Sequence, residues 1–123
     1  MAKFIEQECS SSAAKKFNPL SRNFMLTKNN PTETLEDFMG KLKVNARYAR
    51  VQLEKGKEGT LHFQACVGYE KIKRSLVKMR KEFPGCHIEV TRCALDAWNY
   101  CGKEDTRVEG PLEYGIPPAA LNK

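Results

Sequence analysis

The chain has 123 residues, of which 41% are hydrophobic and 29% are charged, and its formal net charge is +6. This length fits one domain and is too short for a doubly wound nucleotide-hydrolysing domain followed by a second module. The composition excludes a disordered chain, and no apolar run approaches the roughly 18 residues that a transmembrane helix requires. The positive charge permits an anionic partner, but many basic domains merely have a solvated surface.

The cysteines argue against a secreted disulfide framework and against a structural zinc site. Their number is odd, and no two of them have the CxxC spacing that zinc ligands use. We therefore expect reduced thiols in an intracellular protein. The five are Cys9, Cys66, Cys86, Cys93 and Cys101.

Composition divides the chain into three parts. Residues 1–21 show no periodicity and are expected to form a flexible leader, whereas residues 22–115 show strand and helix patterns and are expected to form one domain. Residues 116–123 are typical of the start of a linker. The elements expected in chain order are a strand at 23–27, a short helix capped by Thr32 or Thr34, strands at 46–54 and 61–67, a helix at 70–82, a strand at 86–91, a helix at 94–103 and a strand at 107–114.

Two of these patterns decide the fold class. The strands at 46–54 and 61–67 alternate and are separated by a hairpin-length loop, so we expect them to pair antiparallel. In the segment at 70–82, Ile72, Leu76 and Met79 recur at helical spacing among six basic residues. This order predicts an α+β fold with a central antiparallel sheet of about five strands, and with its flanking helices on one face.

The first candidate site lies on the third expected strand. His62 and Gln64 are two residues apart, so their side chains point to the same face of the sheet. Glu54 is the only acid in the preceding strand, and a hairpin would bring its carboxylate near His62. One imidazole nitrogen and two oxygens suit Mg²⁺ or Mn²⁺ better than a closed zinc site. A purely structural His62 is the alternative, and Glu58 in the loop is the alternative carboxylate.

The second candidate site is Tyr100-Cys101-Gly102-Lys103. Residues three apart share a helix face, so the phenol and the ammonium would lie side by side. A lysine there favours the phenolate, which makes a tyrosine nucleophilic at neutral pH. The alternative is a partly buried tyrosine with a solvated lysine at a helix end. Asp96, one turn before Tyr100, either assists the site or caps the helix.

A third feature is the polar loop after the first strand. Thr27, Lys28, Asn29 and Asn30 carry a hydroxyl, an ammonium and amides that are able to contact a sugar-phosphate chain. A simple strand and turn is equally consistent with these residues.

Together and in this order, the three features resemble the endonuclease domain of the rolling-circle replication initiators (Rep proteins) of small circular single-stranded-DNA viruses. This is the circovirus-like branch of the HUH endonuclease superfamily, and the resemblance covers residues 23–115. Residues 26–31, LTKNNP, resemble the first motif, usually written FTLNNP, although a lysine precedes the two asparagines. Residues 61–64, LHFQ, resemble the second motif, with glutamine in place of the second histidine. Residues 98–104, WNYCGKE, resemble the third motif, YxxK.

The resemblance implies a metal-dependent endonuclease that nicks single-stranded DNA at an origin stem-loop and later rejoins the ends. Tyr100 would form a 5′-phosphotyrosine link and release a 3′-hydroxyl, while Lys103 would steady the developing charge. Glu54, His62 and Gln64 would hold Mg²⁺ or Mn²⁺. The resemblance also implies a location in the host nucleus, no membrane partner, and a helicase domain after residue 123 through which the protein oligomerises.

DNA contacts are expected from the sheet face that carries the metal and from basic groups around it. Two alternative functions remain, a non-catalytic single-stranded nucleic-acid-binding module of RRM-like fold and an origin-recognition module. The expected direction of Phe63, away from the His62 face, argues against the RRM-like module. The candidate DNA-binding residues are Thr27, Lys28, Asn29, Asn30, Arg47, Arg50, Lys71, Lys73 and Arg74.

Overall fold

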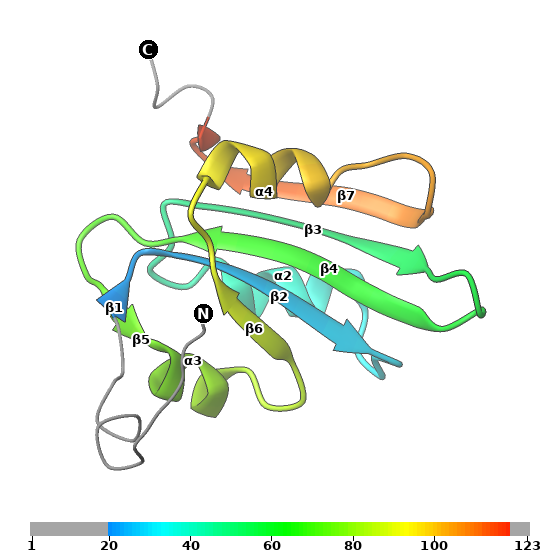
Figure 1. Ribbon diagram of the computed structural model, residues 1–123, viewed down its shortest axis with the longest axis horizontal. Coiled ribbons are helices and arrows are strands. Elements are labelled where there is room, and N and C mark those ends of the chain that lie inside the picture. The colour runs from blue at the N-terminus through cyan, green and yellow to red at the C-terminus, as the bar shows by residue number, and fades with distance from the viewer. Residues whose placement is uncertain (1–19, 119–123) are drawn as a thin grey trace, which may run out of the picture.

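A five-stranded antiparallel sheet, in the order β6-β2-β4-β3-β7, forms the centre of the computed structural model, which describes residues 20–118 (Figure 1). The predicted α+β fold with about five central strands is therefore confirmed. Of the predicted leader, only Leu20 and Ser21 lie within the described residues. The sheet contains β2 (Asn23–Asn29), β3 (Tyr48–Lys55), β4 (Leu61–Gly68), β6 (His87–Val90) and β7 (Arg107–Gly115).

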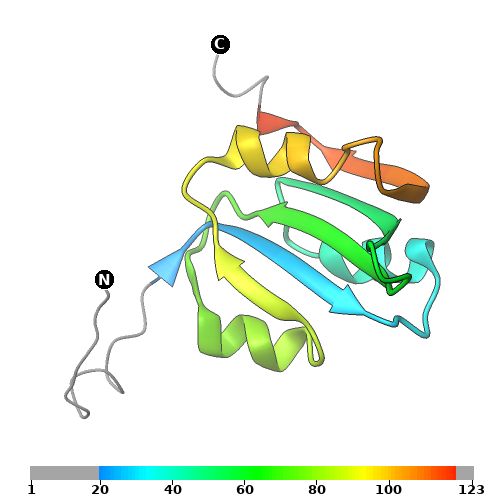
Figure 2. The same ribbon diagram turned by 45° about the vertical axis from the view of Figure 1, so that its right-hand side comes forward.

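Within residues 20–118, three helices flank the sheet, and they lie on both of its faces. They are α2 (Leu35–Leu42), α3 (Leu76–Glu82) and α4 (Ala94–Tyr100). One face packs against α2 and α3 through a large core that includes Phe24 and Phe63, while the other face packs against α4 through Trp98. Figure 2 shows α4 and α2 on opposite sides of the sheet.

The prediction that all helices lie on one face was wrong, because the second face of the sheet carries buried apolar side chains and α4 packs on them. Ala97, Trp98 and Cys101 are buried against Tyr48 and Cys66, which project from the second face of the sheet. The rings of Tyr48 and Trp98 are 5.9 Å apart in an edge-to-face arrangement. This packing places the C-terminal end of α4 over the second face.

Helix α3 begins six residues later than predicted. Arg74 and Ser75 form β5 (Arg74–Ser75), which pairs with β1 (Leu20–Ser21) and ends the extended segment before the helix. The Ser75 hydroxyl then caps α3 by accepting a hydrogen bond of 3.1 Å from the Lys78 amide. Ile72 is consequently 47% exposed and does not belong to a buried helical stripe.

Helix α4 ends at Tyr100, three residues earlier than predicted. The Cys101 amide donates to the Ala97 carbonyl at 3.0 Å, and the Gly102 amide donates to the Asn99 carbonyl at 3.1 Å. Lys103 therefore lies in the turn after the helix, and the predicted sharing of one helix face by Tyr100 and Lys103 was wrong.

The strand register gathers the polar residues on the face that carries α4. Glu54 lies opposite His62 in the β3–β4 pairing, and Thr27 lies opposite Gln64 in the β2–β4 pairing. Phe63 points to the other face, as predicted, and is buried with its ring 5.0 Å from that of Phe38. Among the described residues, no helix is long and apolar enough to cross a membrane.

Candidate active site

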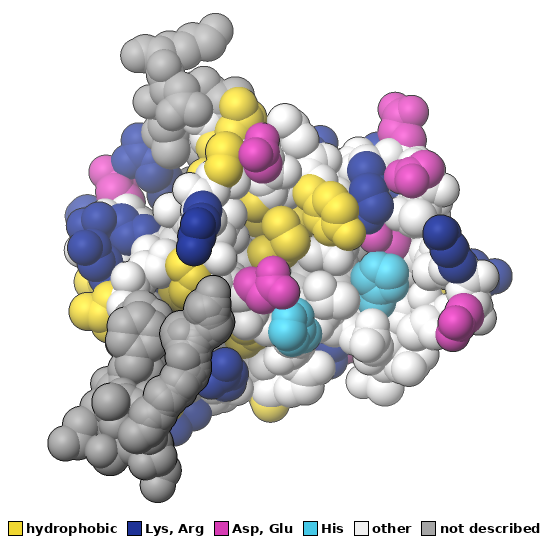
Figure 3. Space-filling model, in the orientation of Figure 1, with side chains coloured by type: hydrophobic (Ala, Val, Ile, Leu, Met, Phe, Trp, Pro, Cys, Tyr) yellow, Lys and Arg dark blue, Asp and Glu magenta, His cyan; other side chains and the backbone are white. Residues whose placement is uncertain are grey.

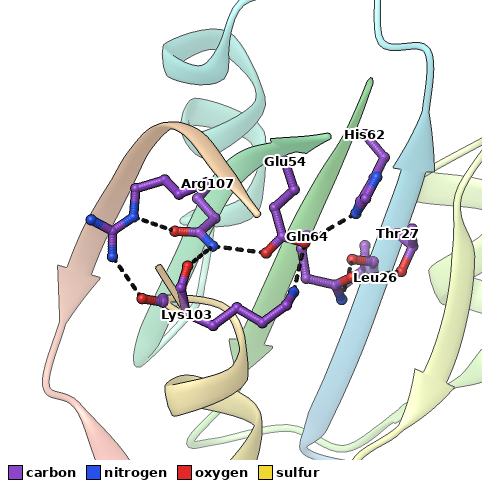
Figure 4. A network of polar contacts seen from close by, with 9 residues as sticks. Leu26, Thr27, Glu54, His62, Gln64, Lys103 and Arg107 are labelled. Carbon is purple, nitrogen blue, oxygen red and sulfur yellow. Dashed lines mark hydrogen bonds and ion pairs between the residues drawn. The ribbon is translucent and has the colours of Figure 1, made fainter. Parts of the chain in front are cut away.

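Glu54 lies at the centre of the site and contacts a histidine, a lysine and a glutamine (Figure 4). Its Oε1 atom lies 3.1 Å from His62 Nε2 and accepts a hydrogen bond of 2.7 Å from Lys103 Nζ. Its Oε2 atom accepts a hydrogen bond of 2.7 Å from Gln52 Nε2. Only 1% of the Glu54 side chain is exposed, whereas His62 and Lys103 keep 16% and 25% exposed. The buried charge is thus fully partnered, as a buried carboxylate requires.

These partners keep the Glu54 carboxyl ionised. Burial by itself raises its pKa, but the hydrogen bonds from Lys103 and Gln52 and the positive charge of Lys103 outweigh burial, so that the pKa lies below its ordinary value. Glu54 therefore presents an anionic oxygen at neutral pH.

Gln64 is held on the same face by the neighbouring strand β2. Its Oε1 atom accepts a hydrogen bond of 3.3 Å from the Thr27 hydroxyl, and its Nε2 atom donates to the Leu26 carbonyl at 3.4 Å. An amide oxygen has two lone pairs, so the bond from Thr27 leaves one for a further partner. Thr27, a candidate DNA contact, therefore also orients Gln64.

The donor atoms of Glu54, His62 and Gln64 suit a small, hard divalent cation. One imidazole nitrogen, one carboxylate and one amide oxygen lie on adjacent strands of one sheet face, and such a set fits Mg²⁺ or Mn²⁺. Within residues 20–118, no group of three or more His, Cys, Asp or Glu side chains is able to hold a metal ion. A metal site here thus depends on the Gln64 amide as its third ligand.

Tyr100 and Lys103 lie together although the helix ends between them. The Lys103 amide donates to the Tyr100 carbonyl at 3.4 Å, and Lys103 Nζ lies 4.0 Å from the centre of the Tyr100 ring. Tyr100 is 48% exposed. One lysine therefore contacts the face of the phenol ring and the Glu54 carboxylate at the same time.

Gln52 joins strand β3 to the turn after α4, and sequence analysis missed it. Its side chain is fully buried; besides Glu54, Nε2 bonds the Lys103 carbonyl at 2.8 Å, and Oε1 accepts from Arg107 Nε at 3.1 Å. Arg107 also donates to the Gly102 carbonyl at 2.7 Å. The sequence spacing could have identified Gln52 as part of the site, because it is two residues before Glu54 and so shares its face of the strand.

Arg50, a candidate DNA contact, is engaged within the protein. Its guanidinium lies 5.0 Å from the centre of the Trp98 ring, donates to the Trp98 carbonyl at 2.8 Å and pairs with Glu113 at 2.9 Å. Gly102 packs against the same guanidinium, and a Cβ atom there would collide with it. Arg50 thus fixes α4 and the turn after it to β3 and β7.

The other basic candidates near β5 lie at the opposite end of the sheet from His62. Arg47 pairs with Glu70 at 2.6 Å beside a hollow of about 460 Å³, which Lys71 also lines. Arg74 is buried and pairs with Glu82. Lys71 and Lys73 are exposed in the irregular segment before β5, and not on a helix as predicted.

Strand β2 extends to Asn29, two residues beyond the predicted strand, so the candidates Lys28 and Asn29 lie in the strand and on opposite faces of the sheet. Lys28 lies opposite the core residue Phe63, and its ammonium pairs with Glu33 at 2.8 Å. Asn29 lies opposite His62, on the face of the site. Asn30 adopts a left-handed φ of 51°, which asparagine tolerates, and its amide donates to the Leu61 carbonyl at 2.7 Å.

The two auxiliary acids are both exposed. Asp96 lies in the first turn of α4, and Glu58 lies in the turn between β3 and β4. Of the two alternative carboxylates, Glu54 is the one that contacts His62.

A groove runs along β6 and α4 beside Tyr100, and we call it the β6–α4 groove. It consists of two adjoining hollows of about 300 and 410 Å³ that share Met25, Glu89 and Tyr100. The first hollow also contains Thr27, Gln64 and His87. The groove therefore opens directly from Gln64 and Tyr100.

Comparison with known proteins identifies the family to which the chain is similar. A model of the family described as "Putative viral replication protein" matches residues 21–104. The chain is 46% identical over 95 residues to a master replication protein of banana bunchy top virus, covering 75% of this chain and 30% of that protein. It is 42% identical over 92 residues to a master replication protein of subterranean clover stunt virus, covering 72% and 29% of the two chains. It is 33% identical over 81 residues to Para-Rep C10 of the milk vetch dwarf C10 alphasatellite, covering 64% and 29%.

Proposed function

The chain belongs to the family of viral replication proteins, and from that premise we propose that it nicks single-stranded DNA at a viral origin through Tyr100 to start rolling-circle replication. The observation that carries the proposal is the position of Lys103. Its Nζ atom lies 4.0 Å from the centre of the Tyr100 ring and 2.7 Å from Glu54 Oε1. A nucleophile, a cation and a candidate metal-binding carboxylate therefore adjoin one another.

In the proposed reaction the phenol oxygen of Tyr100 attacks the phosphorus of the scissile phosphodiester. A bond from phosphorus to the tyrosine oxygen forms as the bond to the 3′-oxygen of the preceding nucleotide breaks. The phenol proton passes to solvent, which reaches the exposed Tyr100 side chain, and the leaving 3′-oxygen takes up a proton. Because one phosphodiester replaces another, a later 3′-hydroxyl is able to displace Tyr100 and rejoin the strand.

Lys103 acts on both the nucleophile and the substrate in this proposal. Its positive charge lies over the face of the Tyr100 ring, where it would attract the DNA phosphate and balance the negative charge that develops on it. Gln52 and Arg107 position it by binding the carbonyls of Lys103 and Gly102.

Glu54, His62 and Gln64 would hold Mg²⁺ or Mn²⁺. Such an ion, when bound, polarises a non-bridging phosphate oxygen and neutralises developing charge. Glu54 contributes the anionic oxygen and Thr27 orients the Gln64 amide.

The proposed substrate is the single-stranded DNA of an origin stem-loop, and the proposed location is the host nucleus. The chain spans about 30% of the banana bunchy top virus relative. A helicase domain, and oligomerisation through it, are proposed for the remainder of a longer protein.

The test is covalent capture of DNA. The chain is incubated with Mn²⁺ and a panel of DNA hairpins with single-stranded loops, and the products are separated under denaturing conditions. We expect a protein–DNA adduct that requires the metal, is lost in Tyr100→Phe and persists in Tyr114→Phe. Tyr114 is the matched control because it is also an exposed tyrosine, 40% against 48%.

An adduct that survives in Tyr100→Phe would contradict the assignment of the nucleophile. DNA binding by the wild-type chain without any adduct would instead favour the non-catalytic binding module. The buried position of Phe63 on the far face already argues against base stacking on that aromatic ring.

A further inference from the structure

The β6–α4 groove begins at the proposed reaction centre and leads away from it. Its first hollow is bounded by Gln64 and Tyr100 and by His87 and Glu89 of β6. Its second hollow continues past Tyr100 and Glu89 to Arg92, in the segment between β6 and α4. A DNA strand whose scissile phosphate lies at Tyr100 would therefore place a neighbouring nucleotide in this groove.

The strand register determines which side chains line the groove. His87 lies opposite Thr27, and Glu89 lies opposite Met25, so both project from the face that carries Gln64. Met25 and the Tyr100 ring add apolar surface to the same hollow. Figure 3 shows the two histidines on one face of the molecule, with exposed hydrophobic side chains beside them.

The negative charge of Glu89 disfavours a phosphate in the groove, whereas its carboxylate oxygens are able to bind a base. Its Oε2 atom lies 2.9 Å from His87 Nε2, and the two side chains are 65% and 70% exposed. A carboxylate repels phosphate, but it accepts hydrogen bonds from the exocyclic amino groups of bases. Unpaired bases present these edges to proteins and stack on tyrosine and histidine rings.

We infer that the β6–α4 groove holds a base next to the scissile phosphodiester, and that Glu89 selects a base with an exocyclic amino group over thymine. This inference rests on the proposed function, because it places the scissile phosphate at Tyr100. His87 orients the Glu89 carboxylate through their contact. Glu89 is thus a specificity-determining residue, and adenine, cytosine and guanine are the bases it accepts.

The experiment selects DNA by binding alone, so that it does not require cleavage. A library of hairpins with a fixed stem and a randomised loop is bound to the Tyr100→Phe chain, and the retained loops are sequenced. Glu89→Gln is then compared with Glu36→Gln in the same background. Glu36 is exposed on α2, across the sheet from the groove, and its substitution removes the same charge.

We expect one loop position at which thymine is depleted roughly tenfold, the discrimination that one base contact commonly provides. Glu89→Gln should remove most of the depletion, because an amide both donates and accepts and so pairs with thymine as well. Glu36→Gln should retain the depletion.

The inference is overturned if no loop position discriminates against thymine, or if Glu89→Gln discriminates as strongly as its parent. Failure of the proposed function gives a different result. In that case the thymine depletion and its dependence on Glu89 are present, but the wild-type chain forms no covalent adduct with the selected loops.

Discussion

At the scale of single residues, the chemistry of the site depends on how one carboxylate oxygen is shared. Glu54 Oε1 contacts both His62 and Lys103, so a cation bound beside His62 competes with the ammonium for that oxygen. Because the Glu54 side chain is only 1% exposed, its charge needs a positive partner in either case.

Replacement of His62 should weaken metal binding more than replacement of the other histidine. His62→Ala removes the only nitrogen ligand of the proposed set, and we expect the Mn²⁺ affinity measured by calorimetry to fall at least roughly tenfold. His87→Ala is the control, because His87 contacts Glu89 and not Glu54. Equal affinities in the two variants would contradict the ligand assignment.

The Lys28–Glu33 pair should make a small contribution to stability that depends on pH. The hydrogen bond from Lys28 lowers the pKa of Glu33 below its ordinary value of 4.5. A carboxyl whose pKa is lowered on folding stabilises the protein above its unfolded pKa, and this contribution disappears as the pH falls through the folded pKa.

Lys28→Met should therefore raise the pKa of Glu33 toward 4.5, as measured by NMR titration of its side-chain carboxyl. The free energy of unfolding at neutral pH should fall by about 0.5 kcal/mol, because both side chains are partly exposed and the pair is screened by solvent. The difference from wild type should vanish in acid. An unchanged pKa of Glu33 in Lys28→Met would show that the Lys28–Glu33 ion pair does not form in solution.

At the scale of elements, the site forms where β3 meets the turn after α4. Gln52 bonds Glu54 on its own strand, the Lys103 carbonyl in the turn, and Arg107 at the start of β7. Its fully buried amide therefore couples the candidate metal ligand to the segment that follows the nucleophile.

Gln52→Leu should destabilise the protein by about 2–4 kcal/mol in urea unfolding, because it leaves buried polar groups without partners. The double variant with Arg107→Leu should lose less free energy of unfolding than the sum of the two single losses, since the two residues share one hydrogen-bond network. Strictly additive losses would show that Gln52 and Arg107 act independently.

The strands and the grouping of Glu54, His62 and Gln64 on one face were predictable from the sequence. Side-chain alternation is local, and a short hairpin loop leaves little freedom in the register of β3 and β4. The same logic correctly directed Phe63 to the opposite face.

The start of α3 and the position of α4 were not predictable in this way. Arg74 and Ser75 are extended because they pair with β1, more than fifty residues earlier in the chain. Helical periodicity carries no information about that pairing. Likewise, the apolar stripe of α4 does not specify which face of the sheet it covers. The contact between Tyr100 and Lys103 comes from a turn whose geometry depends on Arg50 and Arg107.

At the scale of the whole molecule, the exposed lysines before β5 lie far from the proposed reaction centre. Strand β3 begins directly after Arg47, which lines a hollow together with Lys71, and it runs from Tyr48 toward Glu54. At about 3.3 Å per residue, this part of the strand spans roughly 20 Å. A nucleic acid that reaches both must extend across the sheet.

Removal of Lys71 and Lys73 together should therefore weaken DNA binding without slowing the chemistry. We expect the slope of log affinity against log salt to become shallower by up to about 1.4, and the rate of adduct formation at saturating DNA to stay unchanged. The control is Arg80→Ala with Lys81→Ala, two exposed cations of α3. An equal change of slope in the control would show that the effect reflects net charge alone.

The most direct test of the central claim identifies the atom that carries the DNA. The adduct is trimmed with a nuclease, digested with trypsin and mapped by mass spectrometry. Trypsin cuts after Arg92 and Lys103, and the peptide 93–103 contains a single tyrosine. We predict a 5′-linked nucleotide on Tyr100 in this peptide. A nucleotide on any other residue, or a peptide 93–103 without a nucleotide from a purified adduct, would contradict the assignment of Tyr100 as the nucleophile.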